Sequence, residues 1–416
     1  MEKKKESFLK DELTIVKESF AEFYVHSTDI NAIPSKSMKV FYNKKMEINR
    51  DVSCLAANAY NNLYGQKDLI IVDCMAASGI STIRMIKECN NIKKIYINDI
   101  NPIAIDLIHK NIKLNKLELG KPEIIISQKD ANFLFSEIEQ NKFLRLDNSH
   151  KKPNVISIDP FGTPNLYIDS ALKAIQKIHG LICITATDTA VLFGIRPKAC
   201  IRKYMAKPIH TEYCKEIGAR ILVHFIARIA NINNLGIIPI LTFYSNHFIR
   251  VFALTIKDKN EISKNFINYG FIIHCNNCEY RTSIQNSLLN LPHNCPNCGE
   301  SEKLDYAGPL WVGKIHESSF VEELMSLNSK FDYSNKKKIN KILTLILNEI
   351  DMPISYINIH KLCQKLKLSN VPRMDKILDL IKEKGFKASR THFDFTSIKT
   401  DINLELLKNL LLEKFR

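Results

Sequence analysis

The sequence predicts an α/β fold, in which a doubly wound, mostly parallel seven-stranded sheet is followed by a smaller α+β region. Three observations predict it. Short runs of β-branched residues alternate with helical segments from residue 68 to residue 229, and acidic residues follow several of these runs where a strand would end. The alternation then finishes with an antiparallel strand pair. Open α/β sheets bind ligands at the carboxyl ends of their strands, so the acids mark a candidate site.

Length and composition indicate a globular protein of two or three domains. The 416 residues are 45% hydrophobic and 25% charged. No apolar run approaches the ~20 residues that span a bilayer, and the charged N-terminus lacks the apolar core of a signal peptide. We therefore expect a cytoplasmic protein without a membrane segment, in which the seven scattered cysteines of the eleven are reduced.

The net charge of +15 favours a polyanionic partner and salt-sensitive binding. Residues 331–416 hold 17 Lys and Arg against 10 Asp and Glu, a difference of +7. Nearly half of the excess therefore lies in the last fifth of the chain. A charge that serves solubility alone is the alternative interpretation.

The first elements predict a nucleotide-binding unit. A strand over residues 68–73 leads into the small-residue turn 74–81, and small residues let backbone N–H groups approach a ligand. The turn has one glycine, Gly79, so a three-glycine fingerprint is absent. A second strand, 94–98, ends at Asp99, 20 residues after Gly79, and this spacing places a carboxylate on ribose hydroxyls in β-α-β units.

Two further positions fit a bound nucleoside. A helix over 104–117 and a third strand over 123–127 are followed by Asp130 and Ala131, where an acid and a backbone N–H can bond the edge of an adenine. Upstream, Arg50 lies at the start of an expected helix, where a cation opposes the helix dipole. This position hints at a ligand role for Arg50, and a surface arginine is the alternative.

The segment 159–164, DPFGTP, is the strongest candidate for chemistry. It follows a short buried strand over residues 155–158. The Asp159 carboxylate can accept an N–H from an exocyclic amine, Pro160 leaves the preceding carbonyl free to accept another, and Phe161 offers a stacking face. A strand followed by a Pro-Gly turn is the alternative.

The remaining elements of the sheet favour one variant of the fold. A fifth strand over 180–188 precedes an amphipathic helix over 211–229, and strands 236–245 and 248–256 flank a polar turn. A helix followed by an antiparallel pair fits the methyltransferase variant of the doubly wound sheet better than a dehydrogenase. We place the domains at residues 1–262 and 263–416.

Four cysteines form the most specific local motif of the chain, Cys275-x2-Cys278-x16-Cys295-x2-Cys298. Two such knuckles predict a tetrahedral structural zinc. Four thiolates leave no open position for catalysis, and a dithiol redox role is the alternative. The neighbouring His274 and His293 are alternative ligands.

The C-terminal part is predicted to be helical, with helices over 336–349 and 356–366 and a third that ends near residue 384. A basic, strand-like tail over residues 385–400 follows. Three short helices with such a tail predict a winged-helix-like module, and a charged helical tail is the alternative.

Eight blocks of the sequence, in order, resemble the tRNA (guanine-26, N2)-dimethyltransferases across nearly the whole chain. They are FYNKKMEINRD, DCMAASGIS, INDINP, KDANFL, DPFGTP, TATDTAVLFG, RKYMAKPIHTEYCKEIGARILV and RTHFDFTSIKT. The resemblance implies a Rossmann-like domain that uses S-adenosylmethionine, followed by a C-terminal domain that binds tRNA. It further implies that Arg50 holds the cofactor's carboxylate, Asp99 its ribose, and Asp130 and Ala131 its adenine.

The resemblance implies that Asp159 is the catalytic carboxylate, beside Pro160, with Phe41 and Phe161 as aromatic walls of the base pocket. At one position the chain departs from the family. The family often has an arginine where this chain has Ser81, and Arg84 is a candidate substitute. Only part of the family carries the zinc knuckles, so the metal rests on the cysteine spacing.

We therefore expect a monomeric enzyme that transfers one or two methyl groups from S-adenosylmethionine to N2 of guanine 26 in tRNA. An exocyclic-amine methyltransferase acting on another RNA or on DNA is one alternative. A non-catalytic zinc-ribbon protein that binds RNA is another, and intact acids at three strand ends argue against it.

Overall fold

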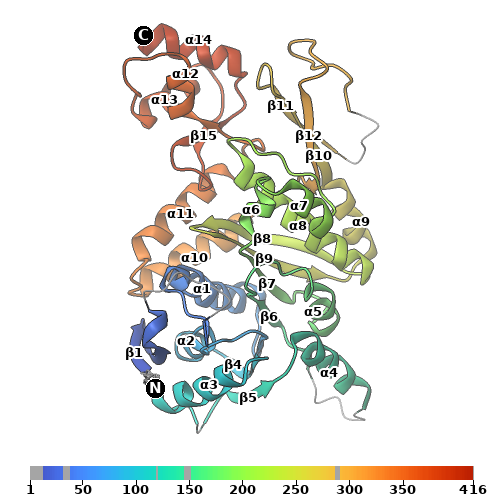
Figure 1. Ribbon diagram of the computed structural model, residues 1–416, viewed down its shortest axis with the longest axis vertical. Helices are drawn as coiled ribbons and strands as arrows, with labels where there is room; N and C mark the ends of the chain where they lie inside the picture. The colour runs from blue at the N-terminus through green and yellow to red at the C-terminus, as the bar shows by residue number, and fades with distance from the viewer. Residues whose placement is uncertain (1–12, 31–37, 119, 145–150, 286–290, 416) are drawn as a thin grey trace, which may run out of the picture.

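A computed structural model describes residues 13–30, 38–118, 120–144, 151–285 and 291–415 (Figure 1). Its centre is a seven-stranded sheet in the order β5-β4-β3-β6-β7-β9-β8. The strands are β3 (Leu69–Asp73), β4 (Ile92–Asp99), β5 (Glu123–Gln128), β6 (Val155–Ile158), β7 (Leu181–Ala186), β8 (Gly236–Ser245) and β9 (Phe248–Ile256). Strands β3 to β7 are parallel, and β9 runs antiparallel to β7 and β8, which confirms the predicted doubly wound, mostly parallel sheet.

Helices cover both faces of this sheet, which explains why its central strands are continuous apolar runs. Every residue of β3, β6 and β7 is buried. One face packs against α1 (Glu47–Tyr64), α2 (Ile80–Glu88) and α3 (Pro102–Leu114). The other packs against α4 (Ala131–Leu144), α5 (Ile168–Ala174) and α8 (Cys214–Ile232), with the short α6 (Thr189–Leu192) and α7 (Pro197–Tyr204) beside α8.

An N-terminal hairpin, which no sequence pattern predicted, joins the α1 face. It consists of β1 (Leu13–Glu18) and β2 (Ala21–His26). Asn111 of α3 fixes its position, since the side chain accepts the N–H of Tyr24 at 2.6 Å and donates to the Tyr24 carbonyl at 3.2 Å. The hairpin thereby places Glu18 in the interior of the protein, where it is 2% exposed.

The chain beyond residue 262 contributes to the same core. After α9 (Lys259–Ile267), strands β10 (Tyr269–Cys275), β11 (Arg281–Gln285) and β12 (Leu304–Trp311) form a sheet in the order β11-β10-β12. Helices α10 (Ser318–Lys330) and α11 (Lys336–Glu349) then return to α1, as Figure 1 shows. Phe320 and Leu343 lie in one apolar cluster with the strands of the large sheet, so the two predicted domains share a core.

The last segment has a core of its own. Strands β13 (Ile357–Asn358), β15 (Ser397–Thr400) and β14 (Ala388–Arg390) form a small antiparallel sheet in that order. Helices α12 (Ile359–Lys365), α13 (Met374–Glu383) and α14 (Leu404–Phe415) surround it at the end of the molecule far from β5 (Figure 1). The winged-helix-like module stays a prediction.

One predicted helix began too early. The sequence predicted a helix over residues 356–366, but residues 357 and 358 pair with β15 and the helix starts at Ile359. Asn358 causes this start, because its side chain accepts the N–H of Lys361 at 2.9 Å as an N-cap.

Part of the predicted basic tail is buried rather than exposed. Lys399 is 3% exposed and donates to Glu216 of α8 at 2.7 Å. His392 is bonded to Glu349 of α11. These buried charges join the last segment to α8 and α11, so they do not contribute to an exposed basic surface.

No helix among the described residues is both long and apolar enough to cross a membrane.

Candidate active site

Four adjacent strands of the large sheet each end in an aspartate. Asp130 follows β5, Asp99 ends β4, Asp73 ends β3 and Asp159 follows β6. Because these strands are parallel neighbours, their carboxyl ends meet at one edge of the sheet. The fold therefore brings together the three acids that the sequence singled out, with Asp73 between Asp99 and Asp159 in the strand order.

The turn between β3 and α2 wraps around the Asp99 carboxylate. Oδ2 of Asp99 accepts the N–H of Ala77 at 2.8 Å, and Oδ1 accepts that of Asn101 at 2.9 Å. Gly79 has φ of +76°, and a Cβ there would lie 3.2 Å from Ile108, so glycine suits the position on both counts. Ser81 lies in the first turn of α2 and is partly exposed. Each Asp99 oxygen keeps a lone pair for a ribose hydroxyl.

Asp130 and Ala131 lie where β5 meets α4. Oδ1 of Asp130 accepts the N–H groups of Asn132 and Phe133 at 2.9 and 3.3 Å, which caps the helix. Asp130 is exposed and Ala131 is buried. Capping fixes the carboxylate without enclosing it, so its second oxygen is accessible to a ligand.

The loop after β6 presents Asp159 beside an aromatic pair. Oδ2 of Asp159 accepts from Nδ2 of Asn49 at 3.0 Å. The rings of Phe41 and Phe161 meet edge to face with centroids 5.6 Å apart, and Phe161 is 49% exposed. The structure thus brings both predicted aromatic side chains together near the carboxylate that follows β6.

A second loop holds this one in place. Gly162 has φ of +112°, its N–H donates to Oγ1 of Thr187 at 2.7 Å, and its carbonyl accepts the N–H of Thr187 at 3.0 Å. Thr163 bonds the hydroxyl of Tyr204 at 3.1 Å, and that hydroxyl donates to Asp188 at 2.8 Å. The DPFGTP and TATD blocks, which are separate in the sequence, are therefore joined by hydrogen bonds.

Arg50 is bonded to the N-terminal hairpin. Its Nε and Nη2 reach the two oxygens of Glu18 at 2.8 and 2.5 Å, and its side chain is 12% exposed. The cation is therefore held in place by a buried carboxylate. A cofactor carboxylate that binds Arg50 must share the guanidinium with Glu18.

Arg84 was the candidate substitute for the arginine that the family often has at position 81. Its environment does not suit that role. It is fully buried and pairs with Glu88 at 2.9 Å, Asp51 at 2.7 Å and Glu18 at 3.5 Å. Its guanidinium also lies 5.3 Å from the ring of Tyr333. With its donors already directed at three carboxylates, Arg84 is a structural residue, and this argues against a substitute role.

Sequence reasoning missed three residues of the site: Asp73, Asn49 and Glu18. Asp73 ends an apolar strand just as Asp99 does, so the same signal would have found it. Burial raises the pKa of Asp73 to about 6, and the nearby charges of Asp159 and Asp99 add to the rise. Asn49 reaches Asp159 from α1, and Glu18 reaches Arg50 from β1. No spacing in the sequence predicts either contact.

The raised pKa of Asp73 predicts a pH-dependent cost in stability. Its ordinary value is 3.8 and its folded value about 6, so the folded state loses stability as pH rises between the two. The free energy of unfolding of Asp73→Asn, relative to the parent, should therefore rise by about 2–3 kcal/mol from pH 4 to pH 7. Urea unfolding across this range measures it. Asp68→Asn is the control, because ion pairs lower the pKa of Asp68; a rise of the same sign there would contradict the assignment.

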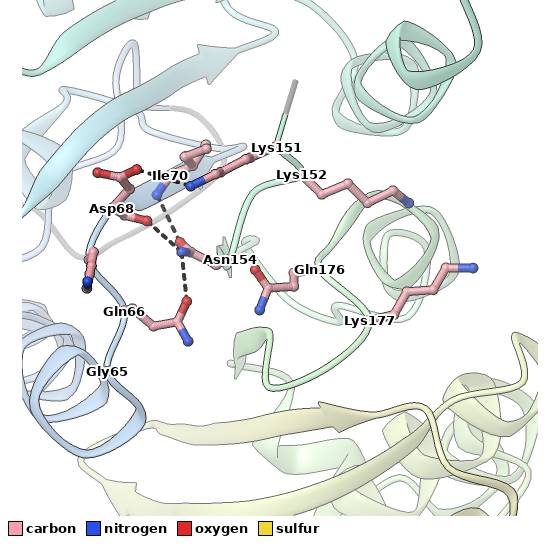
Figure 2. A pocket seen from close by; sticks show the side chains of 10 residues that line it. Gly65, Gln66, Asp68, Ile70, Lys151, Lys152, Asn154, Gln176 and Lys177 are labelled. Carbon is pink, nitrogen blue, oxygen red and sulfur yellow. Dashed lines mark hydrogen bonds and ion pairs between the residues drawn. The ribbon is translucent and has the colours of Figure 1, made fainter. Parts of the chain in front are cut away.

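A hollow of about 490 Å³ lies at the opposite edge of the sheet. It is next to the amino ends of β3 and β6, and Figure 2 shows Asn154 at its centre, bonded to Gln66, Asp68 and Ile70. Several lysines line it: Lys67, Lys151, Lys152 and Lys177. Because the row of acids lies at the carboxyl ends of the same strands, this hollow is not the candidate active site.

The four cysteines form a compact cluster. Sγ of Cys275 lies 3.7 Å from that of Cys298, and Sγ of Cys278 lies 3.6 Å from that of Cys295. All four sulfur atoms fall within 4.8 Å of one another. A zinc ion with Zn–S bonds of ~2.3 Å at the centre of a tetrahedron requires S–S distances of about 3.8 Å, so the thiols fit that ion.

Neither neighbouring histidine belongs to this cluster in the described residues. Nδ1 of His274 lies 2.9 Å from the hydroxyl of Tyr213, and His293 is exposed. The four-cysteine set that the spacing predicted is therefore the set that the fold brings together.

Comparisons with known proteins agree on one family. The family model described as N2,N2-dimethylguanosine tRNA methyltransferase matches residues 21–412. A protein of Methanosphaera stadtmanae named tRNA (guanine(26)-N(2))-dimethyltransferase is 36% identical over 92% of this chain and 93% of its own. One of the same name from Methanothermobacter thermautotrophicus is 35% identical over 89% of this chain and 92% of its own.

A solved structure supports the likeness in three dimensions. Trm1 from Pyrococcus horikoshii in complex with S-adenosyl-L-methionine superimposes with a TM-score of 0.79. It is 29% identical, and the match covers 96% of this chain and 99% of that one.

Proposed function

This chain belongs to the N2,N2-dimethylguanosine tRNA methyltransferase family. We propose that it transfers methyl groups to N2 of guanine 26 in tRNA, and that the reaction takes place at the row of acids along the carboxyl edge of the large sheet. The observation that carries the assignment is that the geometry of the site suits the reaction that the family name describes. Asp99 and Asp130 offer a nucleoside site next to Asp159, which stands beside an exposed aromatic ring. Both the donor and the acceptor of a methyl group thus have a place at one edge.

S-adenosylmethionine supplies a methyl group on a sulfonium. We assign its ribose to Asp99, its adenine edge to Asp130 and the N–H of Ala131, and its carboxylate to Arg50. The donor set supports this assignment, because the Asp99 oxygens keep free lone pairs and Asp130 is exposed. Ser81 at the start of α2 adds a hydroxyl and no charge. Arg50 is therefore the single cation assigned to the carboxylate.

The amine that reacts is a poor nucleophile, because its lone pair is conjugated with the guanine ring. Asp159 accepts one of its N–H bonds and the backbone carbonyl before Pro160 accepts the other. Together these bonds turn the lone pair out of conjugation and towards the methyl group. On transfer, the nitrogen would bond the methyl carbon as the bond from that carbon to the sulfonium sulfur breaks, and the proton that the nitrogen loses would pass to the Asp159 carboxylate. A monomethylated amine keeps one N–H, so one of the two acceptors can still orient it for a second transfer.

The base has to leave its stack before it reaches this edge. Extrusion costs a few kcal/mol, and stacking on an aromatic side chain returns ~1–3 kcal/mol per base. We assign that role to Phe161, which is half exposed, with Phe41 as the second wall. The net charge of +15 supports contacts with the tRNA backbone.

The remaining parts complete the proposal. Residues 1–262 form the catalytic domain and residues 263–416 the domain that binds tRNA, with a winged-helix-like module over α12–α14. A structural zinc ion holds the two cysteine knuckles together. The eleven cysteines, all free thiols in the structure, fit a cytoplasmic enzyme, and we propose that it acts as a monomer.

The basic surface of the last segment predicts salt-sensitive binding of tRNA. Lys376, Lys382 and Lys384 are exposed on and just after α13. Replacing all three by glutamine should weaken tRNA binding and reduce the slope of log K against log salt by up to about 2–3. Filter binding between 50 and 300 mM salt, about the range in which such slopes are measured, tests this.

The lysines of the opposite hollow provide a matched control. The triple change of Lys67, Lys151 and Lys177 to glutamine removes the same charge from the amino edge of the sheet. It should leave the salt slope nearly unchanged. Equal losses from both triple variants would assign the effect to net charge and not to a tRNA-binding surface.

Mass spectrometry of nucleosides tests the function itself. Transfer RNA with guanine at position 26, incubated with the protein and S-adenosylmethionine, should yield N2-methylguanosine and N2,N2-dimethylguanosine. The same tRNA with adenine at position 26 should yield neither. Modification of both would favour the alternative enzyme with another target, and no modification together with no cofactor binding would favour the non-catalytic RNA-binding protein.

A further inference from the structure

A buried arginine lies behind the active-site loop, and no carboxylate of the described residues bonds it. Arg250 of β9 is 1% exposed. In the described part of the chain its hydrogen bonds go to three hydroxyl groups, those of Thr185 at 2.6 Å, Ser157 at 3.1 Å and Ser53 at 3.3 Å. A buried cation without a carboxylate costs stability, so its presence calls for a functional reason.

The hydroxyl partners of Arg250 connect it to Asp159. Oγ1 of Thr185 lies 3.5 Å from Nδ2 of Asn49, and that nitrogen donates to Oδ2 of Asp159 at 3.0 Å. The hydroxyl of Ser53 donates to the carbonyl of Asn49 at 2.7 Å. Asn49 is thus held from both its side chain and its backbone by groups that Arg250 contacts.

The chemistry of Asp159 fixes the orientation of the Asn49 amide. Nδ2 of Asn49 donates to Oδ2 of Asp159, so the nitrogen of the amide faces the carboxylate. Oδ1 of Asn49 is then a buried acceptor without a partner among the described residues, and Nε of Arg250 is likewise a buried donor without one. Two buried polar groups without partners lower the stability of the fold. Their presence in one small network indicates that the network keeps a geometry that function requires.

The network also extends along β6 towards the acids. Arg250 donates to Ser157 at 3.1 Å, and Ser157 lies two residues before Asp159 in the chain. Ser157 is also the pairing partner of Asp73 in β3. The arginine therefore contacts the strand end from which the loop with Asp159 begins.

We propose that Asn49, supported by Thr185 and Arg250, is the positioning residue for the Asp159 carboxylate. Asn49 binds Oδ2, which leaves Oδ1 for the exocyclic amine of the guanine, and Arg250 fixes the hydroxyl against which the amide rests. The inference depends on the role of Asp159 in the proposed function. It adds three residues that do not touch the substrate and that act through the orientation of one that does.

Replacement of Asn49 tests the proposal. Asn49→Ala should lower kcat for methylation of tRNA by about 10- to 100-fold, by analogy with the loss on removing a group that orients a metal ligand. The KM for tRNA and the Kd for S-adenosylmethionine should stay within about threefold of the parent. Single-turnover rates and calorimetry separate these quantities. A kcat within threefold of the parent would overturn the inference.

Asn58→Ala is the matched control. Asn58 is a buried asparagine on the same helix, and its side chain donates to the carbonyl of Glu88 at 2.9 Å. Its replacement should lower the melting temperature and leave kcat unchanged. If Asn58→Ala lowers kcat as much as Asn49→Ala, the loss follows from stability, and the proposal is wrong.

A second pair of variants decides the matter if Asn49→Ala does not fold. Thr185→Val keeps the shape and removes the hydroxyl, whereas Thr185→Ser keeps the hydroxyl. The valine variant should lose kcat and the serine variant should recover it; equal kcat values would overturn the proposal. Asp159→Ala, assayed in parallel, separates the role of Asp159 from the positioning role of Asn49. Full turnover of Asp159→Ala would contradict the proposed role of Asp159 itself.

Discussion

Asp159→Ala should lower the rate of methyl transfer to tRNA by about 10²- to 10⁴-fold, the largest effect expected of any single substitution here. Without the Asp159 carboxylate, the lone pair of the amine stays conjugated with the guanine ring. The group that accepts the N–H of the amine is also lost. Binding should survive, because Asp99, Asp130 and the basic surface are unchanged. Single-turnover rates at saturating cofactor and tRNA measure the loss.

Two further variants sharpen this result. Asp159→Asn can still accept one N–H through its carbonyl, so its rate should fall between those of the parent and the alanine variant. Asp169→Ala is the control, since that carboxylate lies on α5 and bonds Lys173 and Asn233. Turnover of Asp159→Ala at the parent rate would show that another group orients the amine.

The second large effect concerns the cysteine cluster. One equivalent of zinc per chain is expected, and Cys275→Ser or Cys295→Ser should lose it, because each change removes one of four thiolates from a closed tetrahedral set. Structural zinc contributes about 10–16 kcal/mol of apparent binding free energy, so the knuckles should unfold locally without it. Elemental analysis and limited proteolysis near residues 275–298 measure the two losses.

Cys89→Ser provides the control for these variants. Cys89 lies at the end of α2 and outside the cluster, so its replacement should keep the zinc and the protease resistance. Methyl transfer should persist more fully in the zinc-free variants than in Asp159→Ala, since the cluster lies beyond the sheet that carries the acids. A folded, protease-resistant protein without metal would refute the structural role.

The buried contacts of the last segment affect how truncations should be designed. Helix α11 shares a core with α1, and Lys399 reaches Glu216 of α8. Removing residues 331–416 would therefore expose the apolar face of the catalytic sheet and leave buried charges unpaired. Surface substitutions on α13 avoid this problem and test the charge alone.

The sequence predicted the sheet well because its signals are local. An apolar run, a turn of small residues and an acid at the strand end are visible in one window, and parallel neighbours then bring those acids to one edge. Asp99, Asp130 and Asp159 were found in this way. The four-cysteine cluster was predicted for the same reason, since each cysteine pair lies within a single turn.

Only the tertiary structure decided what surrounds these residues. Glu18 pairs with Arg50 across 32 residues, and Arg250 reaches Ser53 across 197, so neither contact has a periodicity that a window can detect. The structure also buried Arg84 and Lys399, which composition alone would place on the surface. The sequence by itself therefore determined the fold class and which acids and cysteines are brought together. Packing decided which of them are held, paired or left free, because burial and long-range hydrogen bonds exist only once the chain has folded.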